Sequence, residues 1–281
     1  EAFLKPEYSG KIVVVGGFMG IDEETNKLTT IGRGGSDTHA AWIAAALGAR
    51  CLYIYSDTSL RRANPKIVPE AEVVPQVTYS EMAEFIVFGA EILAYRANEA
   101  AEEALLKLVL RNTFGLNQGE TIVSSSINNE NYGIKGVAAC PAAVLALSHL
   151  PNAPGAYNKV TEVLTKYNIG FVSEAGDLRN SSMVLNDTPD HLLERNIGMV
   201  MKEIYEQGIV SELVYKTTRI GLIGEGVGKQ TRGLVAIGET LQSLNLPLNM
   251  MSIPINGVAL SLITDSTHVP TVVRGLYNRV F

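Results

Sequence analysis

The sequence contains few cysteines and histidines and no long apolar run, and each scarcity excludes a class of protein. The two cysteines, Cys51 and Cys140, have no CxxC or histidine spacing, so neither a disulfide framework nor a zinc site is indicated. We therefore expect a reducing, cytoplasmic compartment, and the scattered histidines predict no metal site. No run approaches the roughly 20 apolar residues that cross a bilayer, so we expect a soluble protein with no membrane partner.

Excess basic charge is also lacking. The formal net charge of -6 gives no electrostatic reason to expect a nucleic-acid partner, which would call for a basic surface. With 281 residues, 46% of them hydrophobic, the chain can bury a sizeable core in two or three domains. It starts at Glu1 and almost at once enters a buried-strand pattern at residues 11–15, so we expect that upstream sequence is missing.

The first 126 residues are expected to form part of one α/β domain. Residues 11–15 contain a continuous β-branched run, which is typical of a strand buried on both faces of a parallel sheet. A glycine-rich loop at residues 32–37 opens a helix that ends near Gly48, and residues 51–55 form the next strand. A unit of strand, loop, helix and strand builds a parallel sheet.

An internal repeat follows, in which a βαββα pattern occurs twice. The elements expected in the first copy are strands at 142–150, 169–173, 181–185 and 212–215, with helices around residues 160–167 and 193–204. Those expected in the second are strands at 219–224, 248–253 and 258–264, with helices around residues 234–244 and 269–276. We predict a domain at residues 1–126 and two ferredoxin-like units at residues 127–216 and 217–281.

The glycine-rich loop is the candidate site with the clearest chemistry. Its residues are Gly32, Arg33, Gly34, Gly35, Ser36 and Asp37. The glycines permit positive φ and close approach of a ligand, Ser36 or Asp37 can cap the helix, and free N–H groups at the helix start attract anions. Arg33 adds a planar fork that suits a carboxylate. The loop therefore predicts a site for an anionic substrate; on glycine spacing alone, a plain turn with a surface arginine is equally compatible.

Several motifs in the same order resemble the aspartate kinase family. They are GFMG at 17–20, TTIGRGGSD at 29–37, AAALGA at 44–49, Ser56-Asp57, NPKIVP at 64–69, YSEMAE at 79–84 and FGA at 88–90. The family has GFIG, TTLGRGGSD, a small-residue helix, Thr-Asp, DPRxVP, Y-D-E-x-x-E and F-G-A at these places. The resemblance implies a partial amino-acid-kinase parallel-sheet domain followed by two ferredoxin-like ACT domains.

The same resemblance implies an activity and a set of site residues. The reaction would be ATP-dependent phosphorylation of the β-carboxylate of aspartate, with Mg²⁺ neutralising the phosphates, and it is mostly a matter of positioning and charge stabilisation. Arg33 and Asp37 would be catalytic, and Arg33, Gly34, Gly35 and Ser36 would bind the substrate. The implied nucleotide-binding residues are Ser56, Asp57, Arg61, Arg62 and Lys66.

The sequence departs from the family pattern in three places. The Lys-Phe-Gly-Gly-Thr-Ser segment is absent, the loop over the base reads DTSLRR at 57–62 without the family's glycine or tyrosine, and Glu91 replaces a lysine near the nucleotide. Either Arg61 or Arg62 compensates for Glu91, or the nucleotide site has degenerated. The alternative function is therefore a non-catalytic, effector-binding homologue of aspartate kinase that regulates a partner. Another amino-acid kinase is a third choice.

The repeats imply feedback control. The turn at residues 152–155 is similar to the family's D-x-P-G effector loop, so the expected effector-binding residues are Asn152, Ala153, Pro154, Gly155, Ala156 and Ile169. The ligand would be a small end-product amino acid such as lysine or threonine. The activity would then serve lysine or threonine biosynthesis and be controlled by its end product. The second copy has Thr231-Arg232-Gly233 in place of H-P-G, which weakens an equivalent site. The resemblance also implies a homodimer built through the ACT repeats.

Overall fold

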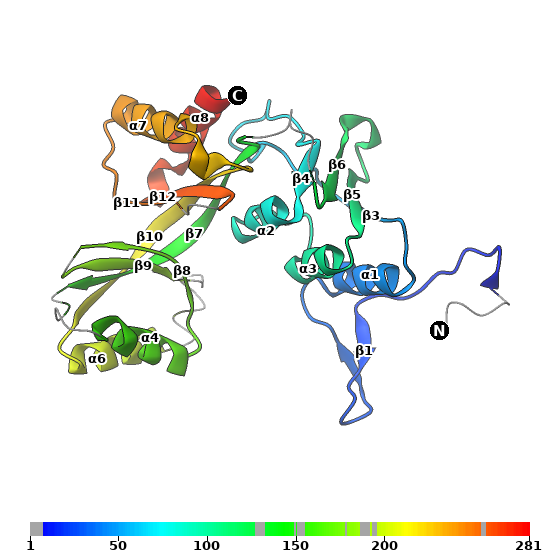
Figure 1. Cartoon of the computed structure of the whole chain (residues 1–281), viewed down its shortest axis with the longest axis horizontal. Coiled ribbons are helices and arrows are strands. Elements are labelled where there is room, and N and C mark those ends of the chain that lie inside the picture. The colour runs from blue at the N-terminus through cyan, green and yellow to red at the C-terminus, as the bar shows by residue number, and fades with distance from the viewer. Residues whose placement is uncertain are drawn as a thin grey trace.

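The computed structural model describes residues 8–126, 133–148, 150, 155–177, 179–185, 192, 196–253 and 257–281. The described chain forms two lobes that meet at helix α2 (Tyr79–Val87), as Figure 1 shows. The N-terminal lobe runs to residue 126, and the C-terminal lobe is built on one six-stranded sheet. Among the helices described, none is long and apolar enough to cross a membrane. The mixed α/β class predicted from the sequence is confirmed.

The N-terminal lobe contains a four-stranded sheet in the order β3-β5-β6-β4. Strands β3 and β5 are parallel, as are β4 and β6, whereas β5 and β6 are antiparallel. The elements of this lobe are β1 (Met19–Ile21), β2 (Leu28–Thr30), α1 (Gly35–Ala46), β3 (Cys51–Ser56), β4 (Gln76–Thr78), α2, α3 (Tyr95–Glu103), β5 (Lys107–Asn112), the 3-10 turn η3 (Leu116–Gln118) and β6 (Glu120–Ser124). The helix expected after the glycine-rich loop and the strand expected after that helix are both present.

The strand predicted at residues 11–15 is not formed, so this expectation is wrong. Ile12 and Val14 are 95% and 92% exposed, and the segment runs away from both lobes (Figure 1). A continuous apolar run becomes a buried strand only where neighbouring strands and helices cover both faces. No described strand pairs with this segment, so its composition alone cannot hold it in a sheet.

The C-terminal lobe carries all its strands in one antiparallel sheet, ordered β11-β12-β10-β7-β9-β8. Its elements are β7 (Gly136–Ser148), α4 (Ala156–Lys166), β8 (Phe171–Gly176), β9 (Ser181–Leu185), α6 (Ile197–Glu206), β10 (Val210–Ile223), the 3-10 turn η5 (Val227–Lys229), α7 (Arg232–Leu244), β11 (Met250–Ser252), β12 (Ala259–Asp265), the 3-10 turn η6 (Ser266–His268) and α8 (Val269–Val280). Strand β9 has the bounds that the sequence predicts.

Two long strands run through both halves of this sheet. The strands expected separately at 212–215 and 219–224 are one strand, β10, and β7 begins at Gly136 rather than at the expected residue 142. The register of β10 against β7 shifts between Val214 and Thr217, where β10 has one extra residue. The domain boundary expected between residues 216 and 217 therefore falls inside β10, at this irregularity. The repeat is a pair of units that share two strands.

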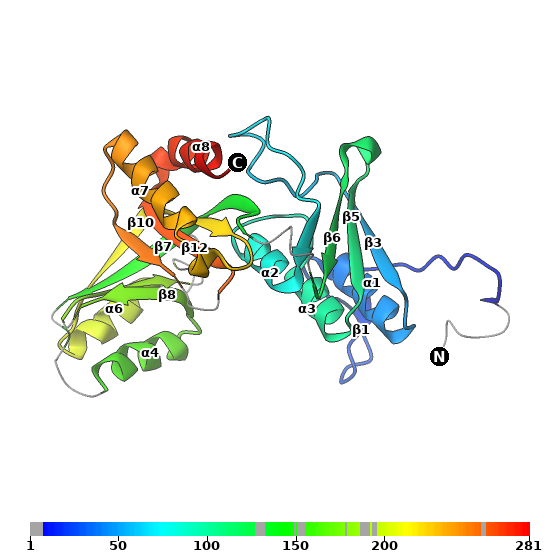
Figure 2. The same cartoon turned by 45° about the horizontal axis from the view of Figure 1, so that its top comes forward.

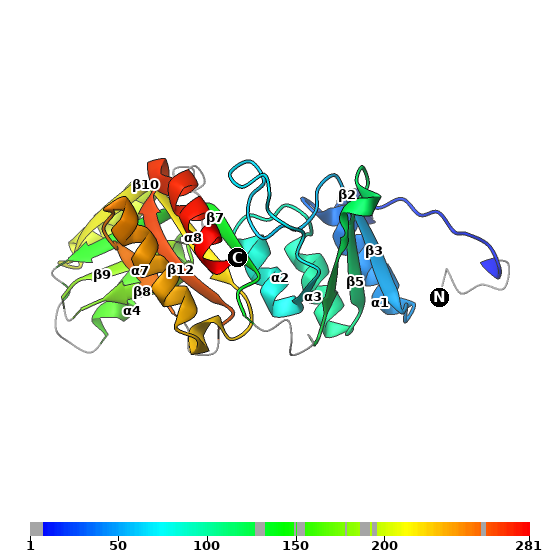
Figure 3. The same ribbon diagram turned by 90° about the horizontal axis from the view of Figure 1, so that it is seen from above.

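The two faces of the shared strands pack against different helices. One face of β7 and β10 presents Val137, Ile220 and Leu222 to α7 and α8, and further along it presents Leu145 and Leu147 to α4 and α6. Figure 2 shows α4 and α6 side by side beneath the strands of their half of the lobe. On the opposite face, residues of β7 and β10 join the core of the N-terminal lobe around α2. Figure 3, seen from above, shows α2 and α3 between the two sheets.

Candidate functional site

The glycine-rich loop has the conformation that its glycines permit. Gly34 is the N-cap of α1 with φ 69°, and Gly32 has φ 91°, both in the region that favours glycine. A Cβ on Gly34 would lie 2.4 Å from the Cβ of Ala94, so the loop presses against the start of α3. Neither of the expected capping side chains, Ser36 or Asp37, caps the helix. The close packing explains why glycine is needed at this position.

The carboxylate of Asp37 is directed away from its own helix. Its Oδ2 accepts a hydrogen bond of 3.2 Å from the backbone N–H of Ala94. Burial raises the pKa of Asp37, and the bond from Ala94 opposes that shift. Arg33 and Ser36, in contrast, are exposed at the start of α1. The loop thus presents Arg33 and Ser36 to solvent, while Gly35 is buried and Asp37 fixes the loop to the rest of the lobe.

Ser56 and Asp57 lie at the carboxyl end of β3, where ligands bind in parallel α/β sheets. The Ser56 hydroxyl donates to Asp57 Oδ1 at 3.3 Å, and the Ser56 carbonyl accepts from the N–H of Thr113 at 2.8 Å. Asp57 is exposed. Both residues are therefore placed at a strand end, as the sequence predicts.

The three candidate basic residues differ in what they contact. Arg61 donates to the carbonyl of Ala71 at 2.7 Å and to Gln118 Oε1 at 3.1 Å. Arg62 lies over the ring of Phe281, with 4.6 Å from Cζ to the ring centroid, and 3.5 Å separates its Nε from Glu72 Oε2. Lys66 is exposed. Arg61 thus contacts two segments of the N-terminal lobe, and Arg62 contacts both Glu72 and the C-terminal residue Phe281.

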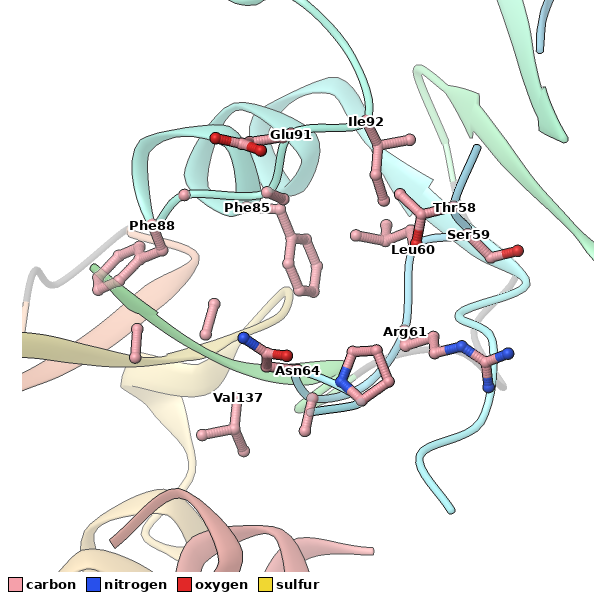
Figure 4. A pocket seen from close by; sticks show the side chains of 16 residues that line it. Thr58, Ser59, Leu60, Arg61, Asn64, Phe85, Phe88, Glu91, Ile92 and Val137 are labelled. Carbon is pink, nitrogen blue, oxygen red and sulfur yellow. The ribbon is translucent and has the colours of Figure 1, made fainter. Parts of the chain in front are cut away.

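A cavity of about 170 Å³ opens beside the strand-end residues, between the N-terminal lobe and β7 (Figure 4). Its residues are Thr58, Ser59, Leu60, Arg61, Ala63, Asn64, Pro65, Phe85, Phe88, Gly89, Ala90, Glu91, Ile92, Val137, Ala138 and Ala139. Figure 4 shows the carboxylate of Glu91 at one side and the guanidinium of Arg61 pointing away. The hydroxyl of Ser59 is buried without a hydrogen-bond partner in the described part of the chain. The cavity has both apolar and polar lining residues, which suits a flat, partly polar ligand.

The loop between α2 and α3 connects the cavity with the glycine-rich loop. Phe88 and Ile92 line the cavity, and two residues further on Ala94 contacts Gly34 and Asp37. Sequence reasoning did not identify Ala94, because an alanine carries no chemical signal and its role depends on its backbone N–H and its small size. The start of α2 carried a readable signal, since Thr78 and Glu81 have the spacing of a capping box and form one.

The expected effector loop lies largely outside the described residues: Asn152, Ala153 and Pro154 belong to the part that is not described. Gly155 is the N-cap of α4 with φ 85°, so a glycine does open this helix, at Ala156. Ile169 is only 4% exposed and packs in the core beneath α4 and α6. Burial, together with a hydrogen bond to Glu174, raises the pKa of Tyr157 to about 12. The first turn of α4 is therefore tied to β8.

Comparison with known proteins shows what the N-terminal lobe, and then most of the chain, is similar to. Residues 2–112 match the model of the amino acid kinase family. The chain is 32% identical over 257 residues to an aspartokinase of Corynebacterium efficiens, covering 86% of the chain and 60% of the relative. An aspartokinase of Rickettsia felis is 29% identical, with 95% and 66% covered. The chain is thus similar to aspartokinases over most of its length and spans less than two thirds of the length of these relatives.

Solved structures agree on the fold. Escherichia coli aspartokinase III in complex with aspartate and ADP superposes with a TM-score of 0.84 at 22% identity, covering 99% of the chain and 62% of that structure. The aspartate kinase of Clostridium acetobutylicum gives a TM-score of 0.83 at 21% identity, with 94% and 62% covered. The chain therefore shares its fold with these two structures over nearly its whole length.

Proposed function

We propose that this chain acts in ATP-dependent phosphorylation of the aspartate β-carboxylate, as an aspartate kinase. The observation that carries the proposal is the glycine-rich loop, which exposes Arg33 beside the start of α1. The N–H of Gly35 donates to the carbonyl of Gly32 at 3.0 Å, but the next N–H groups of the first turn have no intrahelical acceptor, and they lie at the positive end of the helix dipole. The α-carboxylate of aspartate would bind these groups together with the guanidinium of Arg33. Gly34, Gly35 and Ser36 would form the rest of this subsite.

The nucleotide would lie at the carboxyl end of β3. Ser56 and Asp57 would contact it, and its base would enter the cavity beside Ser59, whose buried hydroxyl has no hydrogen-bond partner among the described residues. Lys66 is the exposed cation for the phosphates, whereas Arg61 or Arg62 would first have to leave their present partners. Mg²⁺ in such sites takes most of its ligands from phosphate and water. One or two carboxylates of the chain would suffice to complete its shell.

The shared-strand lobe would contain the regulatory part. We propose tandem ACT units within residues 127–216 and 217–281, the second completed by the first half of β7. A small amino acid such as lysine or threonine would bind at the start of α4, near Gly155. Feedback would follow if this ligand binds two conformations with different affinity. Thermal unfolding with lysine, threonine and methionine, in the unaltered chain and in Asn152→Ala, tests the site; stabilisation that survives the substitution speaks against it.

A homodimer through the ACT repeats is the proposed assembly. Strands β8 and β11 end the described sheet at either side, and an unpaired edge tends to find a partner strand. Light scattering at micromolar concentration checks it. A monomeric mass would rule out this assembly.

The alternative is a non-catalytic homologue that binds the effector and regulates a partner. Two observations favour it: Glu91 places an acid beside the cavity, and both nearby arginines have partners in their own lobe or in the C-terminal residue. Calorimetry with MgATP on the full-length protein separates the two proposals. Binding at submillimolar concentration together with aspartate-dependent ADP release supports the kinase. Absence of binding at millimolar nucleotide leaves the alternative.

A further inference from the structure

The carboxylate of Glu81 is fully buried and is shared between the two lobes. Its Oε2 accepts from the N–H of Thr78 at 2.8 Å, which completes the capping box at the start of α2. The same oxygen accepts from Lys135 Nζ at 2.9 Å, and Oε1 accepts from the N–H of Glu225 at 2.7 Å. Lys135 precedes β7, and Glu225 follows β10. One side chain therefore caps a helix of the N-terminal lobe and binds the residues that flank both shared strands of the C-terminal lobe.

The groups that bind Glu81 make further hydrogen bonds with each other's lobes. The ammonium of Lys135 also donates to the carbonyl of Gln76 at 2.8 Å, and the hydroxyl of Thr78 donates to the Glu225 carboxylate at 3.2 Å. The side chains of Lys135 and Glu81 are 7% and 0% exposed. A buried pair of this kind adds little net stability, but removal of one partner leaves a buried charge without compensation. The cluster therefore fixes one geometry between the lobes.

The other end of α2 is fixed by the same two strands. Arg219 of β10 lies over the ring of Phe88, with 4.3 Å from Cζ to the ring centroid. A Cβ on Gly221 would lie 2.6 Å from this ring, and a Cβ on Gly136 would lie 2.7 Å from the ring of Phe85. Two glycines thus make the space into which two phenylalanines of the α2 region pack. The helix cannot shift along the sheet without losing contacts at both ends.

The chain that leaves α2 reaches both candidate subsites. Residues from Phe88 to Ile92 line the cavity, and Ala94 holds Gly34 and Asp37 of the glycine-rich loop. We propose that Glu81 and Lys135 are positioning residues, which set the place of residues 88–94, and with it the shape of both subsites, through α2. The effect of these two residues on catalysis rests on the proposed function, whereas the coupling that they provide between the lobes does not.

Hydrogen exchange on the whole chain, without ligand, tests the coupling. The variant is Lys135→Met. The matched control is Lys166→Met, which makes the same substitution in the exposed ion pair of Lys166 and Glu203, where the distance from Nζ to Oε2 is also 2.9 Å. We expect residues 88–94 and 34–38 to exchange about tenfold faster in Lys135→Met, while α4 and α6 keep their protection in that variant. The control should leave residues 88–94 and 34–38 unchanged. An increase confined to residues 76–81, 133–136 and 225, or an equal increase across all elements, overturns the proposal.

Two further variants keep the test decisive if Lys135→Met does not fold. The first is the double variant Glu81→Gln with Lys135→Met, in which both charges are absent and the side-chain oxygen of the new glutamine can still accept from the N–H of Glu225. The second is Gly221→Ala, in which the added Cβ displaces the ring of Phe88 at the other end of α2. Each should expose residues 88–94 in the same way. In an active full-length enzyme, Lys135→Met should also raise the KM for aspartate about tenfold. If the unaltered protein shows no kinase activity, the proposed function fails while the exchange result still decides the coupling.

Discussion

The carboxylate of Asp37, in the first turn of α1, accepts a 3.2 Å hydrogen bond from the backbone N–H of Ala94, the residue that precedes α3. This bond joins the glycine-rich loop to the chain that leaves α2. A catalytic role for Asp37 remains a proposal from the family resemblance. The bond adds a positioning role that stands on geometry.

Asp37 should give the protein a measurable pH dependence. Burial raises the pKa of Asp37 in the folded chain above its ordinary value of 3.8, so protonation favours the folded state. Its contribution to the free energy of unfolding is fully present below the unfolded pKa and is lost as pH rises through the folded pKa. Urea unfolding at several pH values should therefore show the unaltered protein losing stability relative to Asp37→Asn as pH rises through this window.

Asp22 provides the control for that titration. Hydrogen bonds from the side chain and the N–H of Thr25 lower the pKa of the exposed Asp22. The sign is opposite, because the ionised form is favoured in the folded state and its contribution is lost as pH falls through the folded pKa. If the differences for Asp22→Asn and Asp37→Asn changed with pH in the same direction, one assignment would be wrong: that of Asp22 if both contributions fall as pH rises, and that of Asp37 if both grow.

Gly34→Ala should destabilise the protein more than Gly48→Ala. Both glycines have positive φ, 69° and 60°, so both variants incur about 1 kcal/mol of backbone strain. A Cβ at Gly34 would also meet Ala94 at 2.4 Å, whereas nothing lies within 4 Å at Gly48. Overpacking adds about 1 to 3 kcal/mol for Gly34→Ala, measurable by chemical denaturation. Equal losses would show that the loop does not press on Ala94.

Arg33→Ala tests the substrate subsite in the full-length enzyme. Loss of a charge-assisted contact to the aspartate carboxylate should lower kcat/KM for aspartate. The loss of transition-state stabilisation should be about 2 to 4 kcal/mol, while ATP affinity stays nearly unchanged. Arg50 is exposed just before β3 and serves as the control arginine. Steady-state kinetics with varied aspartate measures the effect. Unaltered aspartate kinetics in Arg33→Ala would remove the role given to this loop.

Arg62 and Lys66 should respond in opposite ways to alanine substitution. Arg62→Ala removes the stacking on Phe281 and should cost about 1 kcal/mol of stability, with little effect on nucleotide binding. Lys66→Ala should weaken nucleotide binding and leave stability unchanged, because Lys66 is exposed. Denaturation and calorimetry with MgATP separate the two. A large loss of nucleotide affinity in Arg62→Ala would show that this side chain leaves Phe281 when the nucleotide binds.

Glu91→Lys should strengthen nucleotide binding. Glu91 lies beside the cavity, and replacing a negative by a positive charge near a polyphosphate is worth roughly 1 kcal/mol or more at a solvated site, about fivefold in affinity. Glu99→Lys, on the exposed side of α3, makes the same change in net charge and should have little effect. Equal affinities in the two variants would place the phosphates elsewhere.

Local patterns predicted the elements that are decided by neighbours in sequence. The helix after the glycine-rich loop, β9 at Ser181–Leu185 and the helices of the C-terminal lobe follow from apolar spacing, and α1 and α4 also have a glycine as N-cap. The strand expected at residues 11–15 failed because burial on both faces depends on other segments. The sequence also did not predict that two expected strands join into β10. The extra residue at the register shift interrupts the strand pattern in the sequence, and such an interruption is also typical of a short loop.

The sequence by itself determined the glycine-rich loop, the repeat and the resemblance to aspartate kinases, because these depend on residue types in a fixed order along the chain. Only the tertiary structure decided what the loop rests on and how the lobes are joined. Ala94 acts through its backbone N–H and its small size, and Glu81 reaches Lys135 and Glu225 far along the chain. Such contacts depend on distances between segments that packing brings together, and no local spacing contains that information.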